Sequence, residues 1–315
     1  MQVVTPHEVS REAMTGALDD IRRRTRRRWH SMRHDDPSPA ALRGMRDELL
    51  DHVAARGVED PVLDESSRSA LRTAAECALG ELSVGCFPNG DQEITFPLIG
   101  ERLTSEDISF EECVEEAPTA RTWLDAFAVC VAGGLVWDWQ RVIGLLLRDF
   151  ARAIHDGVPY SRHDAVSDPG DLAAMDALRG YLTRSPGHLP RDWPTVALCK
   201  PDAEERGAAA RALDAIGSLT PDQRLLRVLL DDDREAFAQA LVVRLVEYRE
   251  SAGVDAEPRT LLPLDALALA VLAVQVHAWE PAVRSGYLPP DVLGRADALR
   301  RAADGDRNDL GRWTA

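Results

Sequence analysis

The stretch that decides the fold is residues 118–156, PTARTWLDAFAVCVAGGLVWDWQRVIGLLLRDFARAIHD. It consists of two strongly apolar segments, 118–132 and 135–156, with Gly133-Gly134 between them. Apolar segments of this length favour helices over strands, and a glycine pair is typical of a break between helices. We therefore expect two buried helices at the centre of the protein.

Helix start signals extend this pattern towards both ends of the chain. Thr5-Pro6-His7-Glu8 has the composition of a helix N-terminus, and an apolar residue then recurs every four positions from Val9 to Ile21. Ser38-Pro39, Asp168-Pro169 and Thr220-Pro221 repeat the combination of a capping residue and a proline. Each is therefore expected to begin a helix.

The whole chain fits an all-α fold, an antiparallel helical array or irregular α-solenoid of about ten helices. No fixed repeat period is present. The turn residues Pro88-Asn89-Gly90-Asp91 precede the only plausible β segment, near 93–99, where Pro97 restricts a strand to an edge. Helical pattern is expected to resume at Thr104-Ser105-Glu106-Asp107.

The charge of the protein is strongly negative and unevenly distributed. The net charge is −16, yet residues 1–35 hold eight Arg against five Asp or Glu, so the remaining 280 residues carry −19. This acidity opposes binding to nucleic acid and to anionic membranes, and favours a basic partner. The run Arg22–Arg28 lies next to a single aromatic residue, Trp29, so we interpret it as a solvated helix face or an arm resting on the acidic surface.

The cysteine content and the N-terminus favour the cytoplasm. Five cysteines occur without a C-x-x-C pair, as in proteins of reducing compartments, and the N-terminus lacks the apolar stretch of a signal peptide. Two other apolar stretches, 124–147 and 261–279, contain charged or polar residues and are interpreted as buried helices instead of membrane spans.

Three regions are expected along the chain. Residues 1–35 form a basic N-terminal helical arm, 36–293 a helical domain, and 294–315 a C-terminal tail. The proline-rich residues 185–200 mark a possible subdivision of the helical domain.

No catalytic motif is recognisable, so an enzyme is not expected. The best enzymatic candidate is Asp231-Asp232-Asp233, because clustered carboxylates can hold magnesium against a diphosphate. That chemistry needs a second metal-binding segment, and none is present. Asp233 is instead well placed to cap the following helix. His30 and His34 have metal-ligand spacing but lie beside the arginine run, so no metal or other cofactor is expected.

Two parts of the sequence resemble the immunity 49 family of bacterial polymorphic toxin systems. They are Thr119–Phe127 followed by Gly134–Trp139, and the C-terminal run from Leu267–Ala270 through Val283–Pro289, with Leu225–Asp233 between them fitting the same pattern. The resemblance covers roughly residues 35–293. It implies a non-enzymatic cytoplasmic protein that binds and neutralises a protein toxin, and it supplies no catalytic residues.

Two groups of carboxylates are candidates for contact with a basic toxin such as a nuclease. Glu111, Glu112, Glu115 and Glu116 would pair 111 with 115 and 112 with 116 on a helix, where a basic partner would relieve their repulsion. Asp231, Asp232 and Asp233 form the second group, at a turn between helices.

An apolar anchor is also needed, because charge contributes rate and specificity more than affinity. Trp137, Trp139 or Tyr287 would serve if exposed. We expect the arginine arm to lie outside the contact, so that deleting residues 1–35 would leave protection largely intact. Two alternatives remain open: a magnesium-dependent helical enzyme that uses Asp231–Asp233, and a helical adaptor for another cellular partner. The oligomeric state is not predicted.

Overall fold

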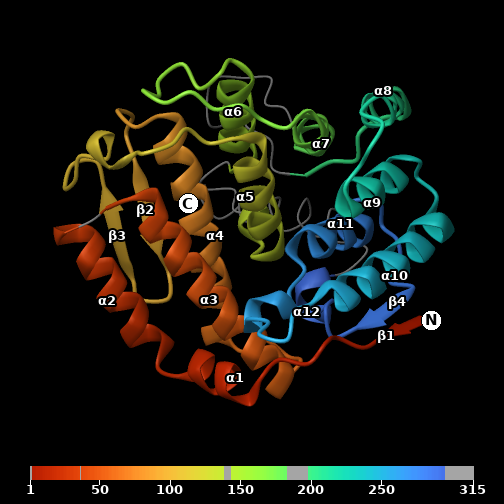
Figure 1. The fold of residues 1–315 in the computed structure, drawn as a ribbon, viewed down its shortest axis with the longest axis horizontal. Coiled ribbons are helices and arrows are strands. Elements are labelled where there is room, and N and C mark those ends of the chain that lie inside the picture. The colour runs from red at the N-terminus through yellow and green to blue at the C-terminus, as the bar shows by residue number, and fades with distance from the viewer. Residues whose placement is uncertain (1, 36, 138–142, 183–197, 295–315) are drawn as a thin grey trace, which may run out of the picture.

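The computed structural model describes residues 2–35, 37–137, 143–182 and 198–294, and these residues are mostly helical (Figure 1). The α-helices are α1 (Arg11–Leu18), α2 (Ile21–His34), α3 (Pro39–Glu59), α4 (Glu65–Cys86), α5 (Ala120–Ala132), α6 (Ile143–His155), α7 (Pro169–Arg179), α8 (Ala203–Asp214), α9 (Pro221–Leu230), α10 (Arg234–Ser251), α11 (Leu264–Gln275) and α12 (Pro290–Leu293). The short 3-10 helices are η1 (Glu111–Cys113), η2 (Leu135–Trp137) and η4 (Pro258–Leu261). The all-α prediction is confirmed, with twelve α-helices in the described residues.

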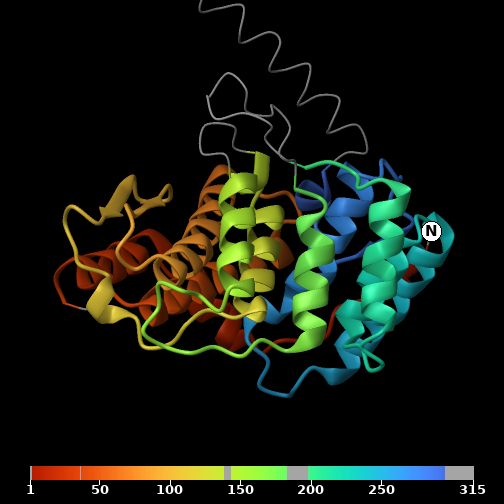
Figure 2. The same ribbon diagram turned by 90° about the horizontal axis from the view of Figure 1, so that it is seen from above.

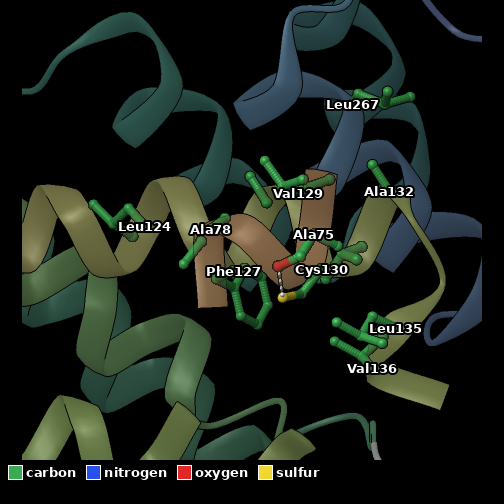
Figure 3. Packing of buried hydrophobic residues seen from close by; sticks show 14 of the residues in the cluster. Ala75, Ala78, Leu124, Phe127, Val129, Cys130, Ala132, Leu135, Val136 and Leu267 are labelled. Atoms are coloured by element: carbon green, nitrogen blue, oxygen red, sulfur yellow. Dashed lines mark hydrogen bonds between the residues drawn. The ribbon is translucent and has the colours of Figure 1, made fainter. Parts of the chain in front are cut away.

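The core lies where α4, α5 and α11 pack together (Figure 3). Trp123 of α5 is fully buried, stacks on Phe127 and donates its indole N–H to the carbonyl oxygen of Leu147 at 2.7 Å. The Cys130 thiol lies 3.9 Å from the carbonyl oxygen of Ala75 on α4, so these two helices are in close contact. The stretch 118–132 therefore forms the buried central helix that the sequence predicts.

Helices distant in sequence share this core. α11 packs on both α5 and α9, although more than 130 residues separate Ala132 from Leu264. Figure 2 shows α6, α7 and α8 standing side by side along one face. Because α11 returns to the centre instead of contacting only its sequence neighbours, the array alternative describes the fold better than a solenoid does.

The predicted β segment near 93–99 supplies the first strand of a hairpin, whose second strand lies beyond it. β2 (Glu93–Phe96) pairs antiparallel with β3 (Glu101–Thr104), and Ile94 is buried against α4. Helical structure does not resume at Thr104 as predicted, because Thr104 ends β3 and a turn follows.

The N-terminal segment crosses the molecule as a strap. β1 (Gln2–Val4) pairs in parallel with β4 (Val283–Ser285), and the chain then runs across to α1 and α2 on the other side (Figure 1). The prediction of a single β segment is therefore wrong: β3 and the β1–β4 pair are additional, because strands of three or four residues are too short to leave a recognisable alternating pattern in the sequence.

The predicted helix start at Thr5–Glu8 is wrong. The first helix begins at Arg11, capped by the Ser10 side chain. His7 is held in the strap: its backbone N–H donates to the Tyr287 hydroxyl at 2.9 Å, and its Nε2 lies 2.9 Å from Thr260 Oγ1. These tertiary hydrogen bonds outweigh the local helix preference.

The arginine arm is part of the folded body. Ile21 and Met32 of α2 are buried, while Arg28 binds Glu48 on α3 at 2.6 Å. Arg22 and Arg26 are exposed. Because deleting residues 1–35 would uncover core side chains, that deletion cannot separate a binding role from a folding role, and substitutions of the exposed arginines are needed instead.

The apolar stretch 261–279 and the proline-rich region were also singled out in the sequence. The window Pro258–Gln275 is long and apolar enough to cross a membrane, but 78% of it is buried inside the protein. Such burial is typical of a core helix. The proposed subdivision near 185–200 and the tail 294–315 fall almost wholly outside the described residues.

Candidate functional site

The carboxylates Glu111, Glu112, Glu115 and Glu116 lie on an irregular segment before α5. Only Glu111–Cys113 forms a 3-10 turn, and the chain is extended at Val114. The predicted i,i+4 pairing on a helix is therefore wrong. The physical reason lies in the neighbouring residues: Val114 and Ala117 are buried, which pins the segment to the protein, and Pro118 disfavours a helical residue before it.

Two of these four carboxylates are already neutralised within the protein. Glu111 forms an ion pair with Arg162, and Glu116 forms one with Arg43 of α3 at 3.2 Å. Glu112 and Glu115 are exposed. The charge available to a partner at this segment therefore comes mainly from Glu112 and Glu115.

The structure gives the three consecutive aspartates three different roles. Asp231 ends α9 and binds Arg227, one turn earlier, at 2.5 Å. Asp233 caps α10 by accepting the backbone N–H groups of residues 235 and 236, which confirms the predicted capping. Asp232 lies between them with φ +61°, and its side chain, 25% exposed, contacts the buried side chain of His277.

Asp232 is the centre of a partly buried polar network. Its carboxylate accepts from Lys200 at 2.6 Å, from Arg206 at 3.1 Å and from Nδ1 of His277 at 2.8 Å. The opposite ring nitrogen of His277 hydrogen bonds with the Tyr181 hydroxyl at 2.9 Å. This network links the α9–α10 turn to α8 and to the end of α11.

Protonation within the network follows from burial and these partners. Burial raises the pKa of Asp232, but hydrogen bonds from Lys200 and His277 outweigh it and hold that pKa below its ordinary value. Burial lowers the pKa of His277, which is therefore neutral near pH 7, and raises the pKa of Tyr181. Asp232 thus carries a negative charge that two cationic side chains already balance.

This arrangement does not fit a magnesium site on Asp231–Asp233. The three carboxylates face an arginine, a cationic network and a helix N-terminus, so they do not converge on one point. Among the described residues, no group of three or more His, Cys, Asp or Glu side chains is arranged to hold a metal ion. Nothing in this geometry favours the enzymatic alternative.

Neither of the two aromatic anchor candidates in the described residues, Trp137 and Tyr287, is a freely exposed side chain. Tyr287 is fully buried, and its hydroxyl hydrogen bonds with the backbone and ring of His7, so it cannot act as an exposed anchor. Trp137 is half-buried and donates its indole N–H to Gln275 at 2.8 Å. Trp139 lies outside the described residues.

A charged crevice that the sequence did not predict lies between α3, α5, α9, α10 and α11. It encloses about 270 Å³, and its walls include Asp222, Arg244 and Asp265. Arg244 binds Asp222 through two hydrogen bonds of 2.7 and 2.8 Å, and Arg121 bridges Asp125 and Asp265 at 2.6 and 2.9 Å.

The carboxylates of this crevice repel one another. Burial, together with Asp222 and Asp125, raises the pKa of Asp265 to about 6, although Arg121 opposes this shift. Burial also opposes the charge on Arg121, but Asp265 and Asp125 outweigh it and raise its pKa. These ion pairs join α10 to α9 through Arg244 and Asp222, and α5 to α11 through Arg121 and Asp265.

Comparison with known families decides the classification. The model of the family described as immunity protein 49 matches residues 60–292, well over half of the chain. The chain belongs to the immunity protein 49 family. Membership implies neutralisation of a toxin, and proteins of this kind are generally non-enzymatic toxin binders. No curated protein and no solved structure matches the chain.

The immunity 49 match confirms the resemblance seen in the sequence, but it covers a shorter stretch of the chain. It begins at Asp60, at the junction between α3 and α4, where the sequence suggested about residue 35. The charged crevice combines Asp125, Asp222, Arg244 and Asp265 from within the matched segment with α3 from outside it, and Arg121 pairs with two of these carboxylates. Only Arg121 and Asp125 are related by helical spacing, so no local signal could have brought the others together.

Proposed function

We propose that this protein binds a basic toxin in the cytoplasm of the cell that makes it, and blocks the toxin by steric and electrostatic means without catalysis. The observation that carries the proposal is the immunity 49 match over residues 60–292. The acidity of the chain supports the finer statement, because a net charge of −16 attracts a basic partner such as a nuclease.

The negative surface charge of the protein can raise the rate at which it associates with a basic toxin. Complementary surfaces steer diffusional encounter, and salt weakens that steering. Glu112 and Glu115 are exposed on a segment that the buried Val114 holds in place, so their position is fixed before any partner arrives. The Asp231–Asp233 group is less suitable, because each of its carboxylates already has a partner within the protein. Asp231 pairs with Arg227, Asp232 binds Lys200 and Arg206, and Asp233 caps α10.

The function is tested by expressing the chain together with the toxin gene found next to its own gene. Protection of the cell, and a direct complex between the two purified proteins, are expected. If a sigma factor or transport operon stands there in place of a toxin gene, the adaptor alternative gains support. A wild-type protein that neither protects nor binds would contradict the proposed function.

The electrostatic part is tested separately by measuring association kinetics at rising salt. The variant Glu112→Gln with Glu115→Gln is expected to slow association at low salt by on the order of tenfold. The matched control removes the same charge from exposed positions elsewhere, Glu12→Gln with Glu204→Gln. Association that responds neither to salt nor to the first pair would refute electrostatic steering while leaving the toxin-binding function intact.

The arginine arm is expected to lie outside the contact. Changing the exposed Arg22, Arg26 and Arg27 to Gln should leave both folding and protection unchanged, because their side chains are solvated. Loss of protection by a folded triple variant would move the contact surface to α2.

A further inference from the structure

An apolar cavity of about 260 Å³ lies where the strap, the end of α3, the start of α4 and the start of α11 meet. Its walls include Ala54, Leu63, Ala132 and Leu267, and every lining side chain among the described residues is apolar. Figure 3 labels Ala132 and Leu267 among the buried hydrophobic residues of the core.

A void of this kind is unusual in a packed protein. Interiors contain few voids larger than a water molecule, and an empty cavity loses the dispersion contacts that atoms on both sides would make. Ordered water compensates little, because the lining side chains are apolar and only backbone groups are left to bind it. Apolar cavities of about 150 Å³ accept benzene, so this one has room for a larger aromatic group.

The mouth of the cavity has the composition of a binding surface. Val58 lines the cavity and is 63% exposed, and Val62, just before the cavity residue Leu63, is 60% exposed. The exposed acidic residues near them are Glu59, Asp60, Asp64 and Glu65. Glu59 and Asp64 pair with Arg56, whereas Asp60 and Glu65 form no ion pair with the described residues and supply the charge available to a partner. An apolar centre with a charged rim is the usual anatomy of a protein interface.

We propose that this cavity is the socket for an aromatic or large aliphatic side chain of a basic protein partner. The exposed valines extend the apolar surface beyond what a small molecule in the cavity would cover, and the acidic rim complements basic residues flanking the anchor. The inference rests on the proposed function, and it supplies the apolar anchor that Tyr287 cannot provide.

The socket and the acidic segment before α5 can belong to one contact surface. Arg43, which holds Glu116, and Val58 at the socket are both on α3. Fifteen residues of helix place them roughly 22 Å apart along the axis and about 60° apart around it. A standard interface of about 800 Å² per partner spans that distance.

The socket is tested first with a defined probe, the capped tripeptide Arg-Trp-Arg carrying 5-fluorotryptophan, followed by ¹⁹F NMR. Saturable binding to the wild type is expected, with at least tenfold weaker binding of the matching Glu-Trp-Glu and Arg-Gly-Arg peptides. No binding of Arg-Trp-Arg, or equal binding of the acidic peptide, would overturn the proposal.

Two variants act on the socket in different ways. Ala54→Leu fills the cavity from its wall, and Val58→Asp removes an apolar group at the mouth while adding a charge that a basic partner should favour. Both are expected to weaken peptide and toxin binding at least tenfold. The control Val254→Asp changes another valine, 95% exposed and outside the cavity lining, and should bind like wild type.

The two proposals fail in different ways. Ala54→Leu should raise the midpoint of thermal unfolding whether or not the cavity binds a partner, so thermal unfolding checks the fold. If that variant is misfolded, Val58→Asp still decides, since its side chain is at the surface. If the wild type and both variants neutralise the toxin equally well, the socket proposal is refuted and the proposed function is unaffected. A wild type that fails to neutralise any toxin would refute the function, and the peptide titration would still judge the socket.

Discussion

Replacing Asp232 by Ala is expected to lower the free energy of unfolding by about 3 kcal/mol. The side chain of His277 has no exposed surface and that of Arg206 is 13% exposed, so water cannot replace the hydrogen bonds they lose. Hydrogen bonds to charged groups contribute about 1.5–3 kcal/mol each and are not additive. Lys200 is 35% exposed and is largely resolvated, and placing Ala at φ +61° adds about 1 kcal/mol.

The adjacent aspartates are matched controls with different expected costs. Asp233→Ala removes a helix N-cap and should cost about 1 kcal/mol. Asp231→Ala removes only an exposed ion pair with Arg227 and should cost less than about 0.5 kcal/mol. Urea unfolding followed by circular dichroism measures all three. Equal costs, or the largest cost at Asp231, would refute the assignment of separate roles. A magnesium site shared by the three would instead show stabilisation by added Mg²⁺ that each variant abolishes.

Further predictions concern pH and packing. Burial lowers the pKa of His52, so as the pH falls below about 6.5 this histidine is protonated in the unfolded chain before it is protonated in the folded protein, and the protein loses stability. In urea unfolding, the variant His52→Gln should lose less stability than the wild type as the pH falls through that range. An equal loss in both proteins would contradict this. Gly16→Ala in α1, where an added Cβ meets no atom, should stabilise by about 0.5–1 kcal/mol. Gly85→Ala in α4 should destabilise by about 1–3 kcal/mol, because its Cβ would lie 2.9 Å from the rigid ring of Pro118. If both glycine variants shift the unfolding midpoint in the same direction, the close approach of Pro118 does not control stability.

The candidate site was predictable only where a residue acts on its own neighbours in the chain. Asp233 caps α10 as its position predicts, because an N-cap binds backbone groups two or three residues ahead. The prediction that the four glutamates before α5 share a helix was wrong, because the burial of Val114 and Ala117 decides the path of that segment. The prediction of Tyr287 as an exposed anchor was wrong, because its hydroxyl group hydrogen bonds with His7 from the other end of the chain.

The sequence by itself determined the helical class, the central buried helix at 118–132 and the starts of helices at Ser38, Asp168 and Thr220, since apolar spacing and capping depend on residues within one or two turns. It also carried the family resemblance. Only the tertiary structure decided that Asp232 lies in a partly buried polar network, that Arg121 joins Asp265, and that an apolar cavity opens beside Val58. Each of these depends on which surfaces meet when helices far apart in the chain pack together, and the spacing of residues along one helix holds no record of that.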